Sequence, residues 1–251
     1  MQWPTHWTLS RTRGAQTCVN SVMHADRDQA RVIIEEYRQN LKTPQLVFLP
    51  AIDPFSITNK ELRDEEVKER LDHYGIPTDL PLVVQNSRFD RWKDPEGVIA
   101  AYKLASREVD CSLVLLGNIA MDDPEGQQVY QSLLSFQDER IHILSHEDTA
   151  FVNALQRHAA VVLQKSIREG FGLTVAEAMW KGKPVIGRNV GGIRRQIEDG
   201  VNGFLVSSAQ EAAVRIAQLI KDKDLRREMG QKAEGEREAA VSLGPSPGTI
   251  P

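Results

Sequence analysis

Apolar residues along the chain fall into short continuous runs, and the stretches between these runs repeat apolar residues at helical spacing. Short runs rich in Val, Leu and Ile are typical of strands buried on both faces of a sheet. They lie at 46–49, 81–85, 112–116, 141–144, 159–163, 184–186 and 204–206. Helices are predicted at 30–41, 59–74, 94–109, 148–158, 173–181, 208–222 and 224–240, with another starting at 122. This alternation predicts an α/β fold, a doubly wound, Rossmann-like parallel sheet.

The regular alternation spans only part of the chain. It indicates one complete domain over residues 45–240, which is the usual size for a single domain. Residues 1–44 form a leader whose first part has no clear period. Residues 241–251 are rich in Gly, Pro and Ser, which predicts a disordered tail.

Composition narrows the class of protein. The chain has 251 residues, of which 41% are hydrophobic and 26% charged, as in ordinary globular proteins. Its net charge of -4 argues against a general nucleic-acid binder. Cys18 and Cys111 are too few for a disulfide framework, and we expect a cytoplasmic protein. No apolar run approaches membrane-spanning length, so no membrane partner is expected.

Gly170 and Gly172 lie in a sharp turn between the strand at 159–163 and the helix that follows it. Glycine lets a backbone turn tightly and approach a ligand closely. The start of the helix directs free N–H groups and partial positive charge outward, which suits a phosphate. Glu169 and Glu177 flank this anion site, which favours a ligand with hydroxyls at both ends and phosphates in the middle. A nucleotide sugar has that layout.

Ligands of open parallel sheets bind beyond the carboxyl ends of the strands. The loops 87–93, 168–173 and 188–194 lie there. Arg88 and Lys93 share the first loop, where a guanidinium fork and a compact ammonium suit one diphosphate. The alternative is a pair of solvated surface cations, but their position on the same edge as the glycine-rich turn favours the diphosphate.

Other kinds of site have weaker signals. Glu169 and Glu177 could form a glycosidase pair, since carboxyl groups roughly 5–9.5 Å apart flank one glycosidic bond in such enzymes. Asp222 and Asp224 have a metal-binding spacing, but a junction between helices favours capping. Neither the dinucleotide-binding nor the P-loop fingerprint is present, which disfavours dehydrogenases and P-loop NTPases. No metal or other cofactor is expected.

Several motifs occur together, and they surround the residues already discussed. They are Ser87-Arg-Phe-Asp90, Trp92-Lys93, Glu169-Gly-Phe-Gly-Leu-Thr174, Glu177-Ala178, Gly182-Lys-Pro-Val-Ile186 and Val190-Gly-Gly-Ile193. Together they closely resemble the retaining GT-B glycosyltransferases of the sucrose-synthase-like family, glycosyltransferase family 4. Pro50-Ala-Ile-Asp-Pro54 and Asp122-Asp-Pro-Glu-Gly126 are similar to its trehalose-forming branch. The resemblance covers about 35–237, the carboxyl-terminal, donor-binding domain, and implies that the amino-terminal acceptor domain is largely missing.

The resemblance implies an activity and a role for each matching residue. Glucose would pass from UDP- or ADP-glucose to free glucose, forming trehalose with the anomeric configuration kept. Arg88 and Lys93 would stabilise the diphosphate, Glu169 would hold the transferred glucose, and Glu177 would bind the ribose. The donor-binding residues implied are Gly170, Phe171, Gly172, Leu173, Thr174 and Glu177. Full-length relatives could form homodimers. The alternative function is a donor-binding fragment or module without transferase activity.

Overall fold

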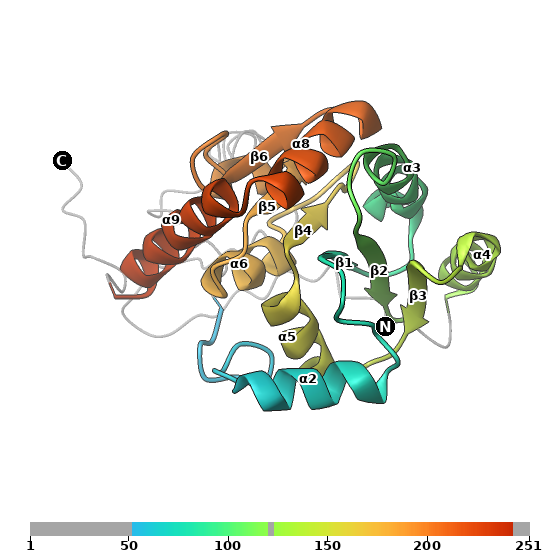
Figure 1. The fold of residues 1–251 in the computed structure, drawn as a ribbon, viewed down its shortest axis with the longest axis horizontal. Helices are drawn as coiled ribbons and strands as arrows, with labels where there is room; N and C mark the ends of the chain where they lie inside the picture. Colours follow the sequence, from blue (N-terminus) through green and yellow to red (C-terminus); the bar gives the residue numbers. More distant parts are fainter. Residues whose placement is uncertain (1–51, 120–122, 243–251) are drawn as a thin grey trace, which may run out of the picture.

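The computed structural model describes residues 52–119 and 123–242 (Figure 1). The predicted leader, the strand at 46–49, Cys18, Asp122 and most of the predicted tail lie outside these ranges. Within them, six parallel strands form one sheet in the order β3-β2-β1-β4-β5-β6. The strands are β1 Leu82–Asn86, β2 Ser112–Gly117, β3 Ile141–Ser145, β4 Val161–Gln164, β5 Val185–Arg188 and β6 Gly203–Val206. The predicted fold class is therefore confirmed.

The strand order reverses between β1 and β4, which pair directly through Val84 and Val162. On one side of this point the chain proceeds outward to β2 and β3, and on the other to β5 and β6. Such a switch leaves a crevice beyond the carboxyl ends of the two central strands, because the connecting helices diverge to opposite faces. The topology thus marks one edge of the sheet for a ligand.

Helices cover both faces of the sheet, and Figure 1 shows α2 with α5 on one side and α3 with α8 on the other. The first face carries α2 Asp64–His73, α5 Thr149–His158, α6 Leu173–Trp180 and α7 Ile193–Gln196. The second carries α3 Pro95–Ala105, α4 Pro124–Leu133 and α8 Ala209–Lys221, and α9 Lys223–Ser242 contacts both α6 and α8. Short 3-10 turns span Arg91–Lys93 and Leu134–Phe136. None of the described helices combines the length and apolar character needed to cross a membrane.

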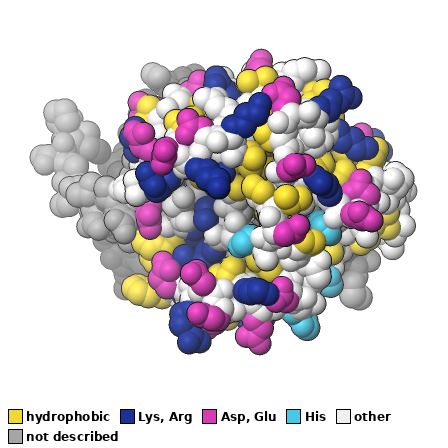
Figure 2. All heavy atoms as spheres, viewed as in Figure 1, with side chains coloured by type: hydrophobic (Ala, Val, Ile, Leu, Met, Phe, Trp, Pro, Cys, Tyr) yellow, Lys and Arg dark blue, Asp and Glu magenta, His cyan; other side chains and the backbone are white. Residues whose placement is uncertain are grey.

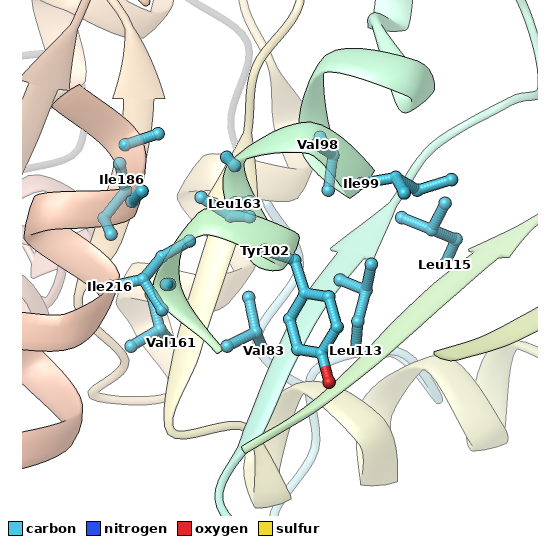
Figure 3. Close-up of a cluster of buried hydrophobic side chains, with 14 of the residues drawn as sticks. Val83, Val98, Ile99, Tyr102, Leu113, Leu115, Val161, Leu163, Ile186 and Ile216 are labelled. Carbon is cyan, nitrogen blue, oxygen red and sulfur yellow. The ribbon is translucent and has the colours of Figure 1, made fainter. Parts of the chain in front are cut away.

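Alternate residues of each strand enter opposite cores, which is why the strands are apolar throughout. Val83 of β1 faces the core beneath α3 and α8, whereas Val84 faces the core beneath α2 and α5. Figure 3 shows the first core, in which Tyr102 of α3 lies between Val83 of β1 and Leu113 of β2. The Tyr102 hydroxyl donates to the Cys111 carbonyl at 2.9 Å, so its only polar atom is satisfied. Burial raises the pKa of Tyr102 to about 12.

The predicted limits of three helices differ from the structure. The helix predicted over 59–74 begins only at Asp64, because Asn59 is buried and its amide donates to the Asp53 carbonyl and the Ser56 hydroxyl. The helix predicted over 94–109 ends at Ala105 in a series of turns. The last helix extends to Ser242, so the first residues assigned to the disordered tail are helical.

Candidate functional site

Three loops meet at the carboxyl edge of the sheet, around the switch between β1 and β4. The loop after β1 joins the loop after β4 where the Ile167 amide donates to the Trp92 carbonyl at 2.7 Å. The loop after β4 joins the loop after β5 where the Gly192 amide donates to the Gly170 carbonyl at 2.8 Å. The three loops singled out in the sequence therefore form one continuous surface.

Lys93 and Glu169 form the centre of this surface. The Lys93 ammonium lies 2.6 Å from a carboxylate oxygen of Glu169, and the two side chains are only 17% and 13% exposed. The same carboxylate oxygen accepts from the Ser166 hydroxyl at 3.0 Å and from the Gln164 amide at 3.3 Å. The carboxylate is thus held by three donors, and the lysine is fixed beside the glycine-rich turn.

Arg88 occupies a different environment from Lys93. Its side chain is 70% exposed and its guanidinium lies 3.1 Å from the carboxylate of Asp90. Asp90 also accepts the backbone amide of Lys93 at 3.0 Å, which closes the 3-10 turn carrying Lys93. The structure therefore places both predicted cations on the same loop, with Lys93 inside the site and Arg88 at its rim.

The glycine-rich turn delivers the amino end of α6 to the site. Gly172 is the N-cap residue and has φ +82°, a left-handed conformation that residues with a side chain rarely adopt. Because glycine has no side-chain oxygen, it leaves the amides of Leu173 and Thr174 without the cap that Ser or Asp would supply. The partial positive end of the helix lies at the same place. The predicted donor-binding residues Gly170, Phe171, Gly172, Leu173 and Thr174 thus form one bend at this edge.

Neighbouring residues hold this bend in position. The Gln196 side-chain amide of α7 donates to the carbonyl groups of Phe171 and Gly172. A side chain at Gly192 would place its Cβ 2.4 Å from the Gly170 carbonyl oxygen, which is too close for any substitution without movement. Gly191 and Gly192, which the sequence placed in the loop 188–194, are therefore needed for close contact between two backbones.

A second charged cluster was not predicted. Lys165, which is 4% exposed, forms an ion pair with Asp94, and Arg188 lies 3.7 Å from the same carboxylate. The sequence placed Asp94 only at the start of a predicted helix, and in the structure it is the N-cap of α3, accepting the Gly97 amide at 3.2 Å. Gln85 accepts the Lys165 amide at 3.2 Å and donates to the Lys93 carbonyl at 3.1 Å. Each of the apolar central strands ends in a polar residue. That pattern in the sequence could have indicated this network.

Glu177 lies one turn into α6, and its surroundings differ from those of Glu169. Burial raises its pKa, and the nearby Lys181 acts in the opposite direction. The Lys181 ammonium donates to side-chain oxygens of Asn59 and Gln156 at 2.9 and 2.8 Å. Burial lowers the pKa of Lys181 to about 7. The two glutamates have separate partners, so these contacts do not join them into the pair of a glycosidase.

The weaker candidates of the sequence have structural roles. Asp222 accepts the Leu225 amide at 2.9 Å, as capping predicts, whereas Asp224 lies within α9 and forms an ion pair with Arg227 at 2.9 Å. His142 and His146, four residues apart, were the other possible metal ligands; His142 lies on β3, whereas His146 packs against Tyr74 with ring centroids 4.9 Å apart. Across residues 52–119 and 123–242, no group of three or more His, Cys, Asp or Glu side chains could hold a metal ion.

Comparison with known proteins identifies relatives of this chain. Relatives named trehalose synthase include those of Pyrococcus horikoshii and Rubrobacter xylanophilus. The first is 44% identical over 195 residues and the match covers 75% of this chain and 47% of the relative. The second is 40% identical over 218 residues, with 84% and 52% covered. The chain thus spans about half the length of these curated relatives.

Solved structures share the fold at lower identity. Anabaena HepE in complex with UDP superposes with a TM-score of 0.70 at 21% identity, covering 88% of this chain and 60% of HepE. The carboxyl-terminal domain of the group 1 glycosyl transferase LpcC from Francisella tularensis gives 0.63 at 23% identity, covering 76% of this chain and 98% of that domain. The fold is that of the carboxyl-terminal domain of GT-B glycosyltransferases. The family model for glycosyl transferases group 1 matches residues 66–236, and the chain belongs to this family.

Proposed function

We propose that this domain binds the nucleoside diphosphate glucose used by a retaining glycosyltransferase that forms trehalose from glucose. The observation that carries the proposal is the mostly buried pair of Lys93 and Glu169, which lies beside the start of α6 at the switch between β1 and β4. Cation, carboxylate and helix terminus suit the diphosphate and the sugar of one donor. The relatives named trehalose synthase support this choice of product.

The transfer breaks the bond between C1 of glucose and the diphosphate oxygen, and negative charge develops on the departing diphosphate. A hydroxyl of the acceptor forms the new bond to C1, and its proton passes to an oxygen of the departing diphosphate, which leaves as nucleoside diphosphate. Lys93, with Arg88 from the rim, would stabilise the developing charge, together with the amides at the start of α6. Preorganised groups of this kind each contribute about 2.7–4 kcal/mol to catalysis. These groups provide the positive charge that a metal ion supplies in other sites, so we propose a reaction without a metal.

The carboxylates are proposed to bind the two ends of the donor. Glu169 is held at the site by Ser166 and Gln164, and with the amides of the glycine-rich bend it would hold the transferred glucose. Glu177 would accept hydroxyl groups of the ribose from its position one turn into α6. HepE has been solved with UDP and with UDP-glucose, which supports a uridine donor, and ADP-glucose is the other candidate.

A turnover assay tests the proposal. The chain is incubated with UDP-glucose or ADP-glucose and glucose, trehalose is detected by NMR, and donor binding is measured separately by calorimetry. Trehalose with both anomeric centres in the α configuration supports retaining transfer. Arg88→Ala and Lys93→Ala should each lower turnover about a hundredfold or more. Unchanged kinetics in both variants would reject the assignment of these cations.

The second candidate function is a nucleotide-sugar binding module without transferase activity. Every group proposed to hold the donor belongs to this single domain, whereas the described residues offer no group that we can assign to an acceptor. Donor binding without trehalose formation would favour this candidate. Failure to bind either donor would contradict both functions.

A further inference from the structure

A basic pocket lies at the opposite edge of the sheet, where the strands begin. Two adjoining hollows of about 440 and 410 Å³ share Lys183, Lys223 and Arg226 in their walls. Ala159 and Ala160, which lead into β4, form the floor of both hollows. Since the strands are parallel, this edge is remote from the loops that carry Lys93 and Glu169. We refer to the two hollows together as the basic pocket.

The charge of the basic pocket is unbalanced. Among the described residues, its walls include Lys181, Lys183, Lys223, Arg226 and Arg227 but only two carboxylates, Asp79 and Glu234. Lys181 is satisfied by oxygen acceptors and Arg227 is paired with Asp224. Figure 2 shows Lys and Arg side chains interspersed with Asp and Glu over most of the face that it presents. The lining of the pocket, in contrast, carries more cations than carboxylates.

Lys183 is the cation of the pocket that the other cations influence most clearly. Within residues 52–119 and 123–242, its ammonium has no hydrogen bond or ion pair. Burial lowers the pKa of Lys183 to about 8, and the nearby Arg157 and Arg226 lower it further while Glu234 opposes them. Burial and the charge of Lys183 also lower the pKa of His158, on the neighbouring wall. Several cations thus surround one mostly buried cation.

Arg226 adds a directional donor. Its guanidinium donates to the Leu219 carbonyl at 3.0 Å, and burial lowers its pKa as well. The guanidinium keeps other N–H groups that can serve a ligand. A fork of this kind with lysines beside it is the combination that suits phosphate oxygens. Arg226 and Lys223 also lie in the first turn of α9, whose partial positive end adds to the field.

We propose that the basic pocket is a second binding site, independent of the donor site, for a small molecule that carries a phosphate group. Burying a cation without a partner costs folding free energy, and an apolar residue in place of Lys183 would avoid that cost. A cation that is enclosed despite this cost is expected where a ligand supplies the missing partner. The volume of each hollow also lies in the range of small-molecule sites.

Inorganic phosphate is the probe for the test, read by NMR from the backbone amides of the intact chain. Phosphate should shift the amides of Ala160 and Gly182 in a saturable manner, with a dissociation constant of roughly millimolar order. Lys183→Met should weaken this binding by about tenfold or more. Lys221→Met is the matched control, because Lys221 is an exposed lysine paired with Glu108 outside the pocket, and it should leave the titration unchanged.

Two outcomes would overturn the proposal. One is the absence of saturable shifts at Ala160 and Gly182, and the other is an unchanged titration in Lys183→Met. Loss of folding does not confuse the result, since Lys183→Met removes a mostly enclosed charge that has no hydrogen bond or ion pair among the described residues, and this should stabilise the protein. Phosphate can also shift the amides of Phe171 and Leu173 at the donor site, and those shifts report on the proposed function alone. The failure of one site is therefore distinguishable from the failure of the other.

Discussion

Replacing Lys93 by Met removes the cation from the mostly buried pair with Glu169 and keeps a side chain of similar length. The two charged atoms are 2.6 Å apart. At an effective dielectric constant of about 20, unit charges at that distance attract by about 6 kcal/mol. Desolvation offsets part of this attraction, and removing one partner of a buried pair typically costs about 3–5 kcal/mol. Ser166 and Gln164 still donate to Glu169, so we expect a loss near the lower limit, about 3 kcal/mol.

Urea denaturation at pH 7 measures this loss, and a double-mutant cycle isolates the pair. Glu169→Gln in the Lys93→Met background removes the unpaired carboxylate, so it should restore part of the lost stability. Lys68→Met is the control, because Lys68 forms an exposed ion pair with Asp72 on α2 and such pairs contribute about 0–1 kcal/mol. Two results would refute the reasoning. One is a loss of unfolding free energy in Lys93→Met that is no larger than in Lys68→Met. The other is that Glu169→Gln destabilises the Lys93→Met variant as much as it destabilises the unaltered protein.

The remaining predictions concern close packing and pH. Gly192→Ala forces a Cβ against the backbone of the glycine-rich bend, so it should cost about 1–3 kcal/mol in urea denaturation and weaken donor binding in calorimetry. Gly235→Ala, on α9 with open space around it, should be neutral or stabilising by up to about 1 kcal/mol, and an equal loss in both would contradict the packing argument. The pKa of Lys183 is about 8 in the folded protein and about 10.5 when unfolded, so the unfolded chain binds more protons between these values. The free energy of unfolding should therefore rise by about 3 kcal/mol from pH 8 to pH 10.5, relative to Lys183→Met measured in parallel. If the free energy of unfolding changed with pH in the same way for both proteins, the pKa of Lys183 would not be lowered by folding, which would contradict this prediction.

Much of the fold could be predicted because its signals are local. Runs such as the one that became β4 are continuous and apolar, since both faces of a central strand are buried. Asp148 and Ser208 were predicted as the first residues of two helices, and in the structure both are N-cap residues whose side chains accept backbone amides. Helix ends were less predictable. Asn59 lies within a helical pattern, yet its side chain bonds to a turn and to Lys181, a contact that no local pattern reveals.

Some features of the candidate site could likewise be predicted from the sequence, and others could not. The glycine-rich bend and the two cations after β1 could be identified, because parallel strands bring the loops at their carboxyl ends to one edge. The role of Asp94 could not, because its partners Lys165 and Arg188 follow other strands. Nor did the sequence distinguish Lys93 from Arg88. Only burial separates a lysine enclosed with a carboxylate from an arginine at the rim.

By itself, the amino-acid sequence determined the alternation of strands and helices, the edge of the sheet that carries the site and the residue types gathered there. These follow from hydrophobic periodicity and from the geometry of parallel strands, which act over short stretches of chain. The tertiary structure decided which charges are paired, which are exposed, and which, like Lys183, are mostly enclosed and have no hydrogen bond or ion pair among the described residues. Those properties depend on contacts between residues far apart in the chain, because solvation and the local dielectric are set only when the elements pack.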